Sequence, residues 1–133
     1  MTYHEPSDYG KLLEGMRALI ILKRDKMKEL KKQIKIAVEE VGFQVFLRAE
    51  GYALMKDESV GILGLPHIRV AFAENVCSIW IRDPYSLKLD LLNMAGYSPR
   101  KYYEEILNVM KKLKEVLESF KKYAEIVTIS IPE

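Results

Sequence analysis

The chain offers two histidines and one cysteine as side chains able to bind a metal or attack a substrate. Metal sites need several His, Cys, Asp or Glu residues at ligand spacing, and His4, His67 and Cys77 form no such motif. We interpret His67, which follows Pro66 between two expected strands, as a surface residue at a strand edge. Cys77 lies in an alternating segment, where a free cysteine packs as a small apolar side chain. We therefore expect no metal site, no cofactor and no catalytic nucleophile.

The acidic residues suggest a comparison with metal-dependent nucleases, whose carboxylates converge on a divalent cation beside a lysine. The acids on or near the expected strands each fall at a turn, and none precedes a lysine by two positions on a strand: Glu50, Asp57, Glu58, Glu74 and Asp83. This distribution argues against a nuclease. No P-loop or dinucleotide-binding fingerprint is present either, so we predict that the protein is not an enzyme.

Basic side chains are concentrated between residues 11 and 35, where nine lysines and arginines outnumber three acids. On a helix, six of them would form a stripe able to neutralise phosphates without reading a base sequence. A solvated helix face explains the same pattern, and no aromatic side chains that could stack on bases interleave with it. The six candidates for nucleic-acid contact are Arg17, Arg24, Lys28, Lys31, Lys32 and Lys35.

The apolar pattern predicts one long helix over residues 7–41. Alternating steps of four and three residues from Tyr9 to Val41 select one stripe of a helix, and the only polar residue in this stripe is Lys23. Such an apolar seam must be covered by another part of the protein or by a partner. The helix would be about 50 Å long, so it must break, overhang or pack on another subunit. The charges beside the seam give no opposite-charge pair in a parallel dimer, so we expect antiparallel packing on the last helix or on a second copy.

From residue 43 onward, alternation with a period of two predicts an antiparallel meander. The expected strands are 43–49, 52–56, 60–65, 68–73 and 76–82, with Glu74-Asn75 as a hairpin turn. A short helix near 84–95, a long helix over 99–124 and a last strand over 127–131 follow. We expect that strand to enter the same sheet and cover one edge.

The expected fold is a single α+β domain over residues 1–133. An antiparallel meander sheet of four to six strands packs against a long N-terminal helix and a long C-terminal helix. The order of elements is α-β-β-β(β)-β-α-α-β.

The composition limits the class of protein and the cellular compartment in which it is expected. With 133 residues and 49% apolar content the chain can bury a core of its own. A lone cysteine indicates a reducing compartment, and no apolar run is long enough to cross a bilayer. We predict a cytoplasmic protein with no membrane partner. Few amides and many Lys, Glu and Ile are typical of thermophiles, which suggests an archaeal or viral source.

Three functions remain open from the sequence. The first is a non-enzymatic protein–protein interaction module that self-associates as a homodimer or larger oligomer, because the apolar run 18–22 covers every side of a helix. The strand that carries Trp80 also has apolar residues on both faces. The expected oligomer interface comprises Leu19, Ile20, Ile21, Leu22 and Trp80.

The second function is binding of DNA or RNA by the basic face of the first helix, residues 17–35. The third and weaker one is a small-ligand pocket between the sheet and the helices. The residues expected to line that pocket are Phe43, Phe46, Trp80 and Tyr103.

Overall fold

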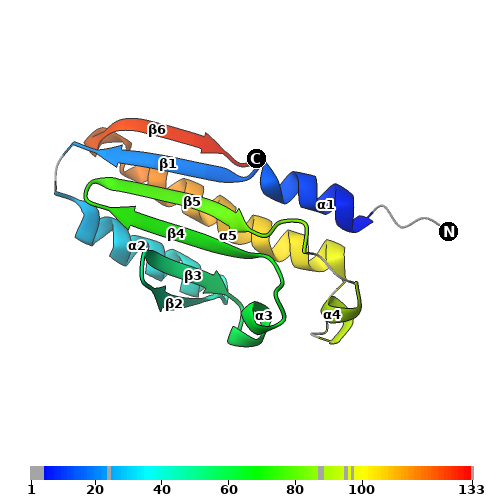
Figure 1. Cartoon of the computed structure of the whole chain (residues 1–133). Coiled ribbons are helices and arrows are strands. Elements are labelled where there is room, and N and C mark those ends of the chain that lie inside the picture. The colour runs from blue at the N-terminus through cyan, green and yellow to red at the C-terminus, as the bar shows by residue number, and fades with distance from the viewer. Residues whose placement is uncertain (1–4, 24, 87–88, 95, 97, 133) are drawn as a thin grey trace.

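The structure, a computed structural model, describes residues 5–23, 25–86, 89–94, 96 and 98–132. Helices and strands alternate along most of this chain (Figure 1). In order they are α1 (Glu5–Glu14), β1 (Arg17–Leu22), α2 (Met27–Glu40), β2 (Gln44–Arg48), β3 (Gly51–Met55), α3 (Glu58–Ile62), β4 (His67–Ala73), β5 (Val76–Arg82), α4 (Leu89–Met94), α5 (Pro99–Ser119), the 3-10 turn η1 (Lys121–Tyr123) and β6 (Ala124–Ser130).

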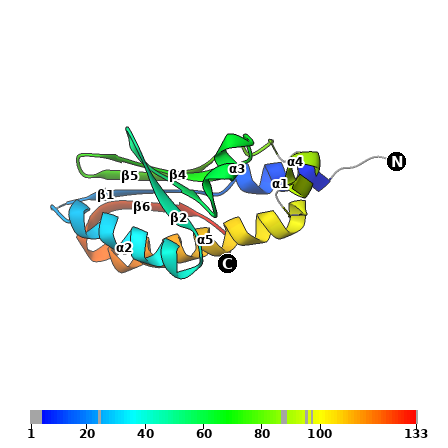
Figure 2. The same cartoon turned by 90° about the horizontal axis from the view of Figure 1, so that it is seen from below.

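The strands form one open six-stranded sheet in the order β2-β3-β4-β5-β1-β6, and every neighbouring pair is antiparallel. Helices α2 and α5 lie antiparallel to each other on one face of the sheet (Figure 2). The other face has no long helix over it, and the short α3 lies at one end (Figure 2). The prediction of a mixed α and β fold with an antiparallel sheet of four to six strands is confirmed, and the sheet has six.

Two connections cross over neighbouring strands through a helix. β1 and β2 run parallel with β5, β4 and β3 between them, and α2 connects them. β5 and β6 run parallel with β1 between them, and α5 connects them. β6 pairs with β1 at an edge, so the predicted entry of the last strand into the same sheet is confirmed.

The single helix predicted over residues 7–41 is wrong. The chain forms α1, then β1, then α2, and the apolar run 18–22 belongs to a strand. In β1, Ala18, Ile20 and Leu22 are buried while the residues between them are not. A run of five apolar residues satisfies the period of a helix and of a strand equally well, and pairing with β5 and β6 selects the strand.

The other boundaries show smaller differences. Residues 60–65, expected as a strand, contribute instead to α3, because the Asp57 side chain accepts a hydrogen bond from the Ser59 amide and caps a helical turn. The turn at Glu74-Asn75 is confirmed, with Glu74 at a φ of 52°. The Asn75 side chain donates to the Leu22 carbonyl at 2.9 Å, which ties this hairpin to β1.

The core fills the space between the sheet and the α2–α5 layer. The helical part of the predicted first seam is buried there, and so is most of the seam predicted in the last helix. α2 and α5 contact each other and run antiparallel (Figure 2). The charge argument for antiparallel packing assumed one continuous helix over residues 7–41, which does not form. The buried apolar residues of the two helices are Met27, Leu30, Ile34, Ala37, Val38, Tyr102, Ile106, Val109, Met110, Leu113 and Leu117.

Candidate functional site: the open face of the sheet

The six basic residues predicted to form one stripe lie on different parts of the molecule. Lys28, Lys32 and Lys35 are exposed on α2, and the half-buried Lys31 places its Nζ 4.9 Å from the centre of the Phe72 ring. Arg17 belongs to β1 and Arg24 lies outside the described residues. The prediction of a single basic helix face is therefore wrong, because its first member is on a strand.

Strand register instead builds a row of side chains across the sheet. Alternation with the buried Ile79 and Ala18 turns Trp80 and Arg17 away from the helices. We call this side, which has no long helix over it, the open face. One register row crosses all six strands, over about 24 Å. It consists of Phe46, Ala53, Arg69, Trp80, Arg17 and Ser130.

Arginines give the open face a positive charge that is only partly neutralised. Arg69 forms an ion pair with Glu50, and Arg82 lies 3.5 Å from the Asp83 carboxylate. The guanidinium of Arg48 lies 5.9 Å from the centre of the Phe46 ring.

For Arg17 the described residues provide no ion-pair partner. Arg17 and Arg48 therefore keep charge available for an anionic ligand.

A shallow hollow of about 280 Å³ lies beside Trp80 on this face. Its walls come from β5, β1 and β6, and Trp80 is 36% exposed. The outward side chains around it are Arg17, Leu19, Ser78, Trp80, Thr128 and Ser130.

Only part of the predicted oligomer interface lies on this face. Leu19, Ile21 and Trp80 are at least partly accessible. Ile20 and Leu22 are buried in the core, so their assignment to an interface is wrong. The reason is again that a strand turns successive side chains to opposite faces.

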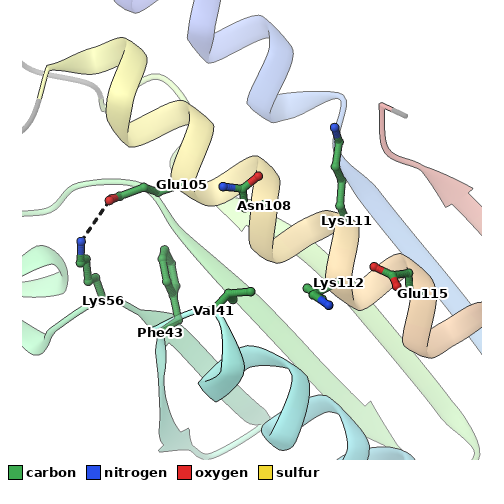
Figure 3. Close-up of a pocket in the computed structure, with 8 residues that line it drawn as sticks. All are labelled: Val41, Phe43, Lys56, Glu105, Asn108, Lys111, Lys112 and Glu115. Carbon is green, nitrogen blue, oxygen red and sulfur yellow. Dashed lines mark hydrogen bonds and ion pairs between the residues drawn. The ribbon is translucent and has the colours of Figure 1, made fainter.

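A second cleft, of about 400 Å³, lies between α5 and the segment that joins α2 to β2 (Figure 3). The Lys56 ammonium meets the Glu105 carboxylate at 3.0 Å at one end, and Lys112 lies near Glu115 farther along α5 (Figure 3). Because lysines and glutamates alternate around this cleft, its charge favours neither an anion nor a cation.

The small-ligand pocket predicted from four aromatic residues does not form. Phe43 borders the cleft on the helical side, whereas Phe46 and Trp80 lie in the row on the open face. Tyr103 stacks on Tyr9 with ring centres 5.1 Å apart.

The side chains with the greatest intrinsic reactivity are buried. His67 is 4% exposed, which corrects its assignment to the surface, and burial lowers its pKa. Burial raises the pKa of the Cys77 thiol to about 12, so the nucleophilic thiolate is not populated at neutral pH. Among the described residues no group of three or more His, Cys, Asp or Glu could hold a metal ion.

Sequence reasoning missed Phe46, Arg48, Arg69 and Arg82 as members of the same surface. Arg69 and Arg82 occupy strand positions next to buried residues, which is a signal available in the sequence. The neighbours of Phe46 and Arg48 on β2 are half-buried or exposed, so that signal is missing there. Placing these four residues on one surface requires the register between neighbouring strands, and this register cannot be read directly from the sequence.

Within the described residues no helix is both long and apolar enough to span a membrane. Comparisons of the chain with family models, with curated proteins and with solved structures gave no match.

Proposed function

We propose that the open face of the sheet binds single-stranded nucleic acid. The observation that carries the proposal is the row in which Arg69, Trp80 and Arg17 are direct cross-strand neighbours. Single-strand binding sites combine basic groups that follow the backbone with aromatic rings on which bases stack. Because α2 and α5 cover the opposite face (Figure 2), the sheet itself presents Trp80 and Arg17 to solvent, whereas the Arg69 side chain on β4 is only 14% exposed.

The geometry favours a single strand over a duplex. Bases can stack on a side chain only when they are unpaired, and duplex readers usually insert a helix or a narrow ribbon into a groove. The open face presents no projecting helix at its centre. With two to four arginines on phosphates, the slope of log K against log salt is expected to be about −1.4 to −2.8.

Charge reversal on the open face is expected to weaken binding and to flatten its salt dependence. The measurement is fluorescence anisotropy with a labelled single strand of about ten nucleotides, a length within the range of known single-strand sites. In the double variant Arg17→Glu with Arg48→Glu, the slope should fall in magnitude by about 1.4, or about 0.7 for each phosphate that the protein no longer neutralises.

The matched control is Lys28→Glu with Lys32→Glu on the helical layer, which changes the net charge equally. It should keep most of the binding and the original slope. No binding of the unmodified protein at low salt, or a greater loss in the helix variant than in the sheet variant, would contradict the proposal.

A second candidate function, self-association, is favoured by the edge strand β6. This strand pairs with β1 on one side, and no described strand pairs with its other side. Ile126 is 48% exposed, and Glu125 is the only charged residue of the strand. Long edge strands with so little charge readily add another strand, so we propose that a second copy pairs with β6.

Light scattering coupled to size-exclusion chromatography tests this pairing. The unmodified protein is expected to be a dimer at high micromolar concentration, and Ile126→Lys should make it a monomer because a lysine on the edge opposes strand addition. Leu47→Lys, on the other edge strand β2, is the control and should leave the dimer intact. A monomeric unmodified protein would exclude the pairing.

A further inference from the structure

We infer that the hollow beside Trp80 holds one unpaired nucleobase of the bound strand, stacked on the indole ring. The inference rests on the proposed function and deepens it. Trp80 forms one wall and the side chain of Leu19 lies on the next strand, so a flat apolar ring finds contacts on two sides. Aromatic side chains stack with every base, because every base presents a π face.

The size of the hollow suits a small group better than a drug-sized ligand. Pockets for drug-sized ligands occupy about 300–1,000 Å³, and this hollow of about 280 Å³ falls just below that range. It is also open to solvent along the sheet, which leaves room for the sugar and phosphate of a base to remain outside. A base attached to a chain therefore fits better than a large ligand that must be enclosed.

Polar groups around the hollow match the edges of a base. The hydroxyl groups of Ser78, Thr128 and Ser130 surround it, and each can both donate and accept a hydrogen bond. Such groups can pair with the donor or the acceptor atoms of any base. We therefore expect a subsite that discriminates only weakly between bases.

Arg17 is placed to bind the phosphate that follows the base. It is the cross-strand neighbour of Trp80 on one side and of Ser130 on the other, and it is one of the residues that line the hollow. A free nucleotide would use this one arginine. A strand would also reach the exposed Arg48 on β2, and this second available positive charge favours the strand.

The test uses Trp80 as its own reporter, because it is the only tryptophan of the chain. Three probes are compared: an oligothymidylate of about ten nucleotides, an abasic sugar–phosphate strand of the same length, and thymidine monophosphate. The oligothymidylate is expected to quench the tryptophan fluorescence. The abasic strand is expected to bind at least about fivefold more weakly and to cause no quenching.

Variants of Trp80 separate stacking from charge. In the anisotropy measurement, Trp80→Ala should weaken the binding of the oligothymidylate by about 5- to 150-fold. The affinity for the abasic strand should stay the same. Trp80→Phe, which keeps an aromatic ring, should restore most of the affinity. Circular dichroism confirms that both variants are folded.

The outcomes distinguish the inference from the proposed function. If the abasic strand binds as tightly as the oligothymidylate and Trp80→Ala has no effect, the base subsite is excluded while strand binding stands. If thymidine monophosphate binds as tightly as the strand, the hollow is a free-nucleotide site and the inference is overturned. If no strand binds at low salt, the proposed function and the inference fail together.

Discussion

Replacing Ile20 by alanine is expected to lower the free energy of unfolding by about 2–5 kcal/mol. Ile20 is fully buried in β1, between Cys77 of β5 and Val127 of β6. The substitution leaves a cavity at the centre of the sheet, where pairing on both sides prevents the backbone from collapsing into it. Urea unfolding followed by circular dichroism measures the change, which is a large part of the stability of a domain this size.

Ile21→Ala is the matched control, because it is the same substitution at the next position. Ile21 is half-buried on the open face, so its truncation is expected to cost about 1 kcal/mol or less. Equal losses at the two positions would contradict the assignment of residues 17–22 to a strand with one buried side.

Gly51→Ala is expected to destabilise the protein by about 3 kcal/mol, the upper end of the usual range for overpacking. A Cβ atom at Gly51 would overlap the backbone carbonyl oxygen of Val70 on the neighbouring strand β4. A backbone atom cannot move to another rotamer, so the β3–β4 ladder itself must shift. Thermal unfolding by calorimetry should show a lower transition temperature.

Gly15→Ala provides the comparison for this glycine. The nearest atoms to a Cβ there are carbonyl oxygens 3.6 and 3.7 Å away, an ordinary contact distance. The free energy of unfolding of this variant is expected to change by no more than about 0.5 kcal/mol. A similar loss at Gly15 and Gly51 would show that the close approach of Val70 is not the cause.

Segments with one clear period and explicit end signals could be predicted from the sequence. The last helix begins after Ser98, whose hydroxyl accepts a hydrogen bond from the Lys101 amide, and its apolar stepping matches the buried face. β4 and β5 were predicted within one residue, because alternation and a two-residue turn agree there. In these places local preference and tertiary packing select the same structure.

The N-terminal third could not be predicted because two periods fit the same residues. The buried residues Leu13, Met16, Ile20, Met27, Leu30 and Ile34 follow steps of three, four and seven even though a strand interrupts them. Gly10 and Gly15 are the residues in this stretch that weaken a helix, and they do not mark the start or the end of the strand. Long-range pairing with β5 and β6 settles the conformation, and a local window does not contain that information.

The candidate site was predicted only in fragments for the same reason. Leu19 and Trp80 were predicted to lie in an oligomer interface, and Arg17 was predicted to contact nucleic acid on another surface. Only the register that places Trp80 opposite Arg17 and Arg69 brings them together. The burial pattern of β5 places Trp80 on the face opposite to Cys77, Ile79 and Ile81.

The position of β1 inside the sheet affects how the protein is made on the ribosome. One of its two neighbours, β6, lies more than a hundred residues later in the chain. At about 5–20 residues per second, the interval between synthesis of Leu22 and of Ser130 is on the order of 10 s. Throughout that interval the most apolar strand of the protein has an unpaired edge, so nascent chains are expected to be clients of ribosome-associated chaperones.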